Sequence, residues 1–278
     1  MATIEQANKR GGRSAPGAWT LRRFFSALAP HASIFLLLVF WESVAHSGLV
    51  TAYLLPPIEA VVVRIGQDIA SGDVFVNLGL TLYRTLAGFG VAAVIGIMLG
   101  VLMWRSRIVF WFFDPIISMG FPMPKVAFLP IFILWFGLFD LSKIMLIIVN
   151  AVFPIVVSTV AGLHQVEREL IWSARSMGAS ERRVSFEIVP SAALPQILTG
   201  LQVALPISLI VAVVTEMIMG GGGLGGSMIE SARYLISAGV FAGIVEIAAA
   251  GFLLIKSMEL IRRRLLVWHV ETAPPAWT

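Results

Sequence analysis

The chain has 278 residues, of which 58% are hydrophobic and only 13% are charged. Soluble domains are about 45–50% apolar and about 25% charged, so this composition excludes a soluble globular protein. The absence of cysteine excludes disulfides and thiolate metal sites, and a net charge of only +4 does not indicate nucleic-acid binding.

The first 30 residues form a basic segment rich in Gly and Ser. Such a composition cannot build a packed core, so we interpret residues 1–30 as a tail. A secretory signal peptide is the alternative, but no small-residue cleavage site follows the apolar run around Leu36. The basic residues of the tail are Lys9, Arg10, Arg13, Arg22 and Arg23.

Six apolar runs are long enough to cross a membrane. A crossing takes about 20 apolar residues, and a backbone in hydrocarbon must satisfy its own hydrogen bonds. The sequence therefore predicts an all-α integral membrane protein with one transmembrane domain over residues 31–270. The six predicted helices cover residues 33–50, 86–104, 108–136, 141–162, 194–219 and 239–260.

The basic residues near the ends of these helices predict their orientation. Cytoplasmic loops carry an excess of Lys and Arg, and six crossings place most of the basic residues on one side. Both termini are therefore expected in the cytoplasm, including the tail 271–278. The basic side has the N-terminal tail, Arg105, Arg107, Arg168, Arg175, Arg182, Arg183 and residues 262–264, and the other side has Arg64, Arg84, Lys143 and Arg233.

Two apolar segments depart from a simple crossing. Residues 58–69 have apolar residues on one face, which predicts a short amphipathic helix on the outer surface. The third run, 108–136, is too long for one straight helix and contains Pro122, Pro124, Lys125 and Pro130, so it is expected to tilt, kink or break. Bending alone and a role in lining a transport pathway both remain open, and Lys125 slightly favours the pathway because an ammonium at membrane depth is costly.

Four acidic residues lie within or at the ends of apolar runs: Glu42, Asp114, Glu216 and Glu246. An intramembrane carboxylate is by default a functional candidate. The alternatives are a proton relay of a secondary transporter and a hydrogen bond between helices, and for each acid alone we favour the structural role. Glu216 is the strongest functional candidate.

Motifs for catalysis and nucleotide binding are missing or out of context. Residues 220–226 nominally fit G-x-G-x-x-G, but they follow a membrane helix instead of a strand, so we expect a sharp turn there. The sequence has no P-loop, no H-E-x-x-H and no G-x-S-x-G. We therefore expect no catalytic, cofactor or metal site in this chain, and any ATPase must be another chain.

The loop 164–190 is the most informative polar segment. Val166, Leu170, Ala174 and Met177 recur at helical spacing and are expected to face the protein. Arg168, Trp172 and Arg175 fall on another side of that helix.

Local signals divide this loop into two helices. Gly178 is placed to end the first helix in a left-handed conformation, Ser180 to cap the next turn, and Pro190 to prevent its continuation. The predicted helix–turn–helix could dock another protein, and a solvated connector is the alternative.

At this loop the sequence resembles the inner-membrane permease subunits of ABC importers. Their signature is E-A-A, three residues, Gly, nine residues, then I-x-L-P. Ala174 matches the last Ala, Gly178 the Gly, and residues 188–190 the closing element. Trp172 and Ser173 stand where the family usually has Glu and Ala.

The resemblance extends over residues 41–268 and is greatest to the branch for nitrate, sulfonate, taurine and thiamine precursors. The matching residues keep their spacing over most of the chain, and such agreement rarely arises by chance. The matching residues are Leu55-Pro56-Pro57, Thr81-Leu82, Arg84, Gly88-Phe89, Pro124-Lys125-Val126-Ala127, Pro130, Trp135-Phe136-Gly137, Phe153-Pro154, Ala192-Ala193-Leu194-Pro195 and Glu216.

The resemblance implies a type I importer bundle of the MetI-like kind in the bacterial inner membrane. It implies a second copy of the chain, two cytoplasmic ATPase subunits that hold ATP and Mg²⁺, and an external binding protein that delivers a small organic or inorganic anion or zwitterion. The pathway candidates are Pro122, Pro124, Lys125 and Glu216. The ATPase-docking candidates are Trp172, Ser173, Ala174, Arg175, Met177, Gly178, Ala179, Ile188 and Pro190.

Two other functions remain as alternatives. An ion-coupled secondary transporter would use Glu216 or Lys125, and a membrane-embedded enzyme would form product without a partner chain.

Overall fold

The computed structural model describes residues 32–267, and every regular element in this range is helical. The described residues divide into two compact units, residues 32–58 and residues 59–267. The predicted tails, 1–30 and 271–278, lie outside the described residues. The shorter α-helices are α2 (Ile58–Ser71), α4 (Arg107–Gly120), α5 (Leu129–Phe136), α7 (Arg168–Ser176), α8 (Glu181–Arg183) and α10 (Leu224–Arg233).

In the first unit, the described part contains the apolar helix Ala32–His46. Trp41 Nε1 donates to the carbonyl of Pro56 at 2.9 Å, and Glu42 Oε2 accepts from the backbone N–H of Ile58 at 3.0 Å. Glu42, one of the four acidic candidates, therefore makes a structural contact with the backbone of Ile58, the last residue of this stretch of the first unit. The N–H groups at a helix start need such acceptors because they have no partner inside the helix.

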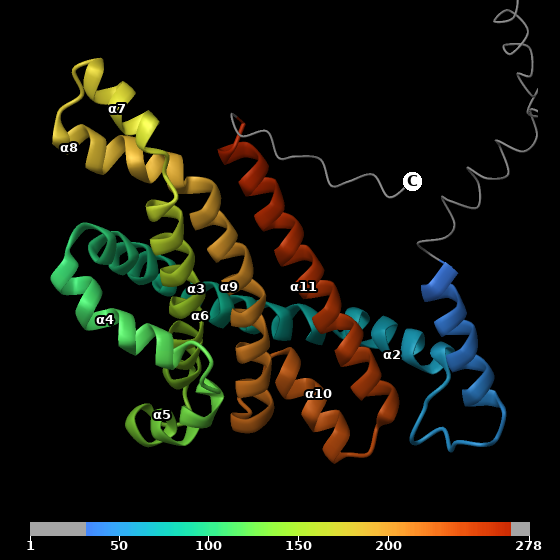
Figure 1. Cartoon of the computed structure of the whole chain (residues 1–278). Helices are drawn as coiled ribbons and strands as arrows, with labels where there is room; N and C mark the ends of the chain where they lie inside the picture. The colour runs from blue at the N-terminus through green and yellow to red at the C-terminus, as the bar shows by residue number, and fades with distance from the viewer. Residues whose placement is uncertain (1–31, 268–278) are drawn as a thin grey trace, which may run out of the picture. The chain divides into compact units, whose positions relative to one another are not determined.

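The core of the second unit is formed by α3 (Asp73–Arg105), α6 (Asp140–His164) and α9 (Val189–Met219), which pack side by side (Figure 1). Glycines bring α3 close to α6: a Cβ added at Gly88, Gly96 or Gly100 would lie 2.5–2.8 Å from side-chain atoms of α6. Small residues at helix contacts are typical of membrane bundles, where close backbone approach gains dispersion energy. These contacts fix the arrangement of the three helices.

Within residues 32–267, four helices are long and apolar enough to cross a membrane, and a bent pair adds a fifth crossing if it counts as one. The four are α3, α6, α9 with the turns before it, and α11 (Ser237–Leu265). The helix Ala32–His46 is shorter than this class. The chain is thus a helical, multi-pass membrane protein, and the count of six and the cytoplasmic termini stay predictions.

The bent pair lies in the third predicted crossing. Helix α4 ends at Gly120, and a 3₁₀ turn, η1 (Lys125–Phe128), leads into α5. The two halves are bent by 97°, which confirms that this run breaks near its prolines. The short amphipathic helix predicted at 58–69 is also present as α2.

Helix α3 is longer than the crossing predicted within it. We expected the second crossing to begin at residue 86, whereas α3 begins at Asp73. The polar residues Thr81 and Arg84 interrupt the apolar run but point inward and are buried, so the helix continues through them. Polar interruption of hydropathy is therefore a poor guide to a helix end where the polar groups have partners.

The two ends of the bundle carry different features. In Figure 1, α7 and α8 lie at one end of α9, and α5 and α10 lie at the other end. Four consecutive glycines, 220–223, have φ between +69° and +94° and turn the chain from α9 into α10. This turn confirms the interpretation of the glycine-rich stretch.

Candidate functional site

The loop 164–190 folds into the predicted helix–turn–helix. Helix α7 is followed by Gly178 at φ +87°, whose N–H donates to Arg175 O at 2.9 Å. Ser180 Oγ accepts from the N–H of Arg183 at 3.3 Å, which begins α8. The chain then continues through a π-helical turn, η2 (Val184–Ile188), into α9.

The helix–turn–helix is anchored to the core at a few positions. Ala174 and Val184 are buried, and Val184 packs in a cluster with Leu163, Val189 and other apolar residues at this end of the bundle. An ion pair between Arg175 Nε and Glu181 Oε1, 2.8 Å apart, bridges the turn. Ion pairs this exposed contribute little to stability, so the buried apolar side chains hold the loop.

The outer face of this loop is apolar and exposed. Trp172 is 57% exposed and Met177 81% exposed. A hollow of about 690 Å³ lies beside Met177, and Ala174 forms part of its wall. The other lining residues are Leu170, Met177, Ala179, Arg183, Glu187, Ile188, Ser191 and Ala192.

Two expectations for this loop are wrong. Pro190 does not stop the helix: it lies in the first turn of α9, where a missing N–H costs little and the π-helical turn before it adjusts the backbone. Leu170 and Met177 do not face the protein, because α7 is anchored at Ala174 and leaves both side chains exposed. The predicted inward face is thus only partly buried.

At the other end of α9, Glu216 is the centre of a buried polar cluster. Its side chain is fully buried and accepts from Thr81 Oγ1 at 2.9–3.0 Å and from the N–H of Gly225 at 3.1 Å. Arg84 Nη1 donates to Glu216 Oε1 at 2.8 Å. A buried carboxylate needs this many partners because desolvation is costly.

Arg84 connects the cluster to a second helix and to the glycine turn. Its guanidinium is 2% exposed and pairs with Asp140 Oδ1 at 2.8 Å. It also donates to the carbonyls of Gly221 and Gly222 at 2.8 and 3.0 Å. The fork of five N–H donors suits arginine to this arrangement.

A second cation holds the start of the same turn. Lys143 Nζ, on α6, donates to the carbonyl of Gly220 at 2.6 Å. Thr81 accepts from the N–H of Leu224 at 2.9 Å and Asn77 from that of Gly223 at 2.9 Å. The cluster therefore joins α3, α6, α9 and α10 at one end of the bundle.

Sequence reasoning identified Glu216 but not its partners. Thr81 entered only through the family resemblance, Arg84 through the resemblance and the count of basic residues, and Asp140 was not singled out. The available signal was Arg84 itself, an arginine within the mostly apolar stretch 78–95, because a charge at membrane depth requires a partner. The identity of that partner, 132 positions away, carried no local signal.

The pathway candidates in the bent segment differ from one another. Lys125 is buried, and its Nζ donates to the carbonyls of Phe121 and Met123 at 3.0 and 3.4 Å and lies 4.4 Å from the centroid of the Phe153 ring. Pro122 and Pro124 are exposed beside it. Lys125 thus has partners within the bend, and a role in a pathway stays a prediction.

The two remaining acids lie beside hollows. Asp114, on α4, lines an apolar hollow of about 630 Å³ with Ser118 and His164. Glu246, on α11, lines a polar hollow formed with α2, α3 and α10. No group of three His, Cys, Asp or Glu side chains within residues 32–267 is arranged to hold a metal ion.

This helical architecture is that of a multi-pass membrane protein. Residues 92–267 match the family described as the binding-protein-dependent transport system inner membrane component. Because the match covers more than half of the chain, the chain belongs to this family. It is therefore the membrane component of an ABC importer and not the ATPase.

Comparisons with individual proteins agree with this assignment. The chain is 34% identical over 240 residues to the taurine transport system permease protein of Escherichia coli (strain K12), covering 84% of this chain and 87% of that protein. It is 32% identical over 267 residues to an aliphatic sulfonates transport permease protein of Bacillus subtilis (strain 168), covering 96% and 95%. The MetNI methionine ABC transporter in an inward-facing conformation has the same fold, with a TM-score of 0.56, 18% identity and coverage of 71% and 98%.

Proposed function

We propose that two copies of this chain form the pathway of an ATP-driven importer in a bacterial inner membrane. An external binding protein delivers a small organic or inorganic anion or zwitterion. Two cytoplasmic ATPase subunits bind the two copies of the loop 164–190. Closure of the ATPase pair moves the two loops together, and the helices rock to open the pathway.

The exposed face of the loop 164–190 carries this proposal. Trp172 and Met177 present exposed apolar surface on a turn that buried Ala174 and Val184 hold in place, and Met177 lies beside a hollow. Exposed aromatic and Met side chains on a rigid support are typical of protein-binding surfaces. The loop is also continuous with α9, so a force applied there acts directly on a membrane helix.

The Glu216 cluster argues against the ion-coupled alternative. A proton relay needs a carboxylate that can gain and lose a proton during transport. Glu216 is instead fully buried and accepts hydrogen bonds from Thr81, Arg84 and the backbone of Gly225, so these contacts support a structural role between helices. The substrate class is supported by the relatives, whose names refer to taurine and aliphatic sulfonates.

The proposal is tested by ATP-dependent uptake in vesicles without an ion gradient, using wild-type chain and Gly178→Trp. A Cβ at Gly178 would meet no atom within 4 Å, so the folding cost is limited to about 1–2 kcal/mol of left-handed backbone strain. The bulky side chain is nevertheless expected to block the ATPase subunit. Insertion should persist, whereas co-purification with the ATPase and uptake should be lost.

Gly48→Trp is the matched control, because Gly48 also has a positive φ, +74°, and open space around its Cα. This variant should keep ATPase association. Unimpaired uptake by Gly178→Trp would contradict the proposal. Uptake that needs an ion gradient and no ATP would favour the secondary transporter.

A further inference from the structure

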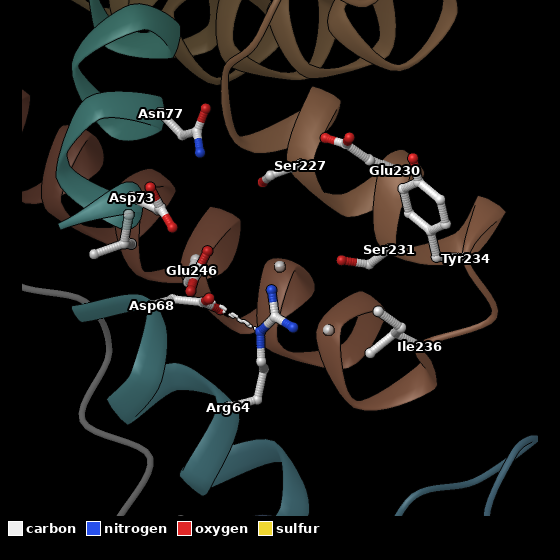
Figure 2. A pocket seen from close by; sticks show the side chains of 13 residues that line it. Arg64, Asp68, Asp73, Asn77, Ser227, Glu230, Ser231, Tyr234, Ile236 and Glu246 are labelled. Atoms are coloured by element: carbon white, nitrogen blue, oxygen red, sulfur yellow. Dashed lines mark hydrogen bonds and ion pairs between the residues drawn. The ribbon is translucent and has the colours of Figure 1, made fainter. Parts of the chain in front are cut away.

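A polar hollow lies between α2, α3, α10 and α11 in the second unit (Figure 2). Its volume is about 410 Å³, within the range of about 300–1,000 Å³ that is typical of small-molecule sites. Neither the Glu216 cluster nor the loop 164–190 uses its charged groups. The ionisable residues of the lining are Arg64, Asp68, Asp73, Glu230, Tyr234 and Glu246.

Two polar groups of this hollow lack partners. Ser231 is only 8% exposed, its hydroxyl makes no hydrogen bond with any residue of the described range, and it points into the hollow (Figure 2). Glu246 Oε1 is buried and also has no hydrogen-bond partner in that range. An unsatisfied buried polar group costs about 1–3 kcal/mol, so a ligand that donates to Glu246 Oε1 would gain this energy.

The charges of the lining are predominantly negative. Four carboxylates, from Asp68, Asp73, Glu230 and Glu246, face one guanidinium. A positively charged group is therefore favoured in the hollow. A protonated amine fits such a lining because it combines a positive charge with hydrogen-bond donors for carboxylate oxygens.

Arg64 adds a positive pole to the same hollow. Its Nε donates to both carboxylate oxygens of Asp68, at 2.9 and 3.0 Å, while the two Nη groups make no hydrogen bond with the described residues. Figure 2 shows this guanidinium directed into the hollow, between Glu246 and Ser231. Free guanidinium N–H groups suit a sulfonate or carboxylate.

We propose that this hollow binds a small zwitterion, with its protonated amine at the acidic groups and Ser231 and its sulfonate or carboxylate at Arg64. This inference deepens the proposed function, on which its role in transport rests: it favours an amino-sulfonate or amino-carboxylate over a simple anion such as nitrate. Four carboxylates around one arginine would repel an ion that carries only negative charge.

The test measures equilibrium binding to the purified chain in lipid nanodiscs. The probe is taurine, and the matched competitors are ethanesulfonate, which lacks the amine, and ethylamine, which lacks the sulfonate. Taurine is expected to bind at least about tenfold more tightly than either competitor. Equal or tighter binding of ethanesulfonate, or no binding of taurine at millimolar concentration, would overturn the proposal.

Variants locate the site and separate its poles. Glu246→Gln should weaken taurine by about tenfold while leaving ethanesulfonate unchanged, and Ser231→Ala should weaken taurine in the same direction. Arg64→Gln should remove the preference of the chain for taurine over ethylamine. The control Glu59→Gln, an exposed acid of α2 outside the hollow, should bind as wild type.

The outcome is distinguishable from that of the proposed function. ATP-dependent uptake without taurine binding to the purified chain would refute only the site in the hollow. Taurine binding that depends on Glu246 and Arg64, without any ATP-dependent uptake, would refute only the importer mechanism. Binding that is unchanged in Glu246→Gln, Ser231→Ala and Arg64→Gln would show that the zwitterion binds elsewhere and would refute the hollow.

Discussion

Replacing Glu216 by Gln removes the charge at the centre of the buried cluster and preserves the side-chain size. Glu216 Oε1 accepts from Arg84 Nη1 at 2.8 Å, and Oε2 accepts from the N–H of Gly225 at 3.1 Å. Glutamine has one oxygen and one NH₂ group, and the NH₂ group cannot accept. In either amide orientation, one of these two donors therefore loses its acceptor.

The expected loss of stability depends on the partners that Arg84 keeps in this variant. The guanidinium still pairs with Asp140 at 2.8 Å and donates to the carbonyls of Gly221 and Gly222, so its charge is not left alone. Removing one partner of a buried ion pair costs about 3–5 kcal/mol, and the retained contacts place Glu216→Gln at about 3 kcal/mol. For a chain of this size, that loss lowers the melting temperature by about 6–12 °C.

The assay is thermal unfolding of the purified chain in detergent, with Glu187→Gln as the matched control. Glu187 pairs with Arg183 at 3.1 Å, but both side chains are exposed, so this change should cost less than about 1 kcal/mol. Equal melting temperatures for Glu216→Gln and Glu187→Gln would refute the reasoning that the cluster stabilises this end of the bundle. The double variant Arg84→Met with Glu216→Leu should be less destabilised than Arg84→Met alone, because no uncompensated charge remains buried.

Two more substitutions test the packing around the turn and the bend. Gly225→Ala should destabilise the chain by about 1–3 kcal/mol, because the added Cβ would overlap the backbone carbonyl of Val213. The control Gly226→Ala meets no atom within 4 Å and should be neutral or stabilising. Equal melting temperatures for the two variants would contradict the contact at Gly225. Lys125→Met should lower the melting temperature, since the carbonyls of Phe121 and Met123 lose their donor, at a cost of about 1–3 kcal/mol. An unchanged melting temperature with impaired uptake would instead assign Lys125 to the pathway.

The loop 164–190 was largely predictable because its signals are local. The left-handed Gly178 and the capping Ser180 act within a few positions of the chain, and the structure has both as expected. The exposure of Leu170 and Met177 was not predictable in this way. Which side of α7 packs depends on the orientation of the whole turn against α9, and the helical spacing of apolar residues does not distinguish a face that meets the core from one that remains exposed.

Long-range partners explain most of what the sequence did not reveal. Arg84 and Glu216 are 132 positions apart, and Arg64 and Glu246 come together only when α2 and α11 meet at the hollow. Each of these charges is visible in the sequence as an unusual residue beside apolar ones, but its role depends on which helices pack together. Partners on other helices likewise allow α3 to include Thr81 and Arg84, whereas hydropathy alone predicted a later start.

Helix α9 connects the two candidate sites. It has 31 residues, a length of about 46 Å at 1.5 Å per residue, and runs from the loop 164–190 to the Glu216 cluster. That cluster holds the glycine turn and α10, and α10 supplies Glu230 and Ser231 to the polar hollow. A displacement of the loop by an ATPase would thus reach the hollow through one continuous helix and one buried ion pair. The proposed docking surface and the proposed zwitterion site would be coupled by rigid elements, with the interior prolines 195 and 206 as the places where α9 could bend.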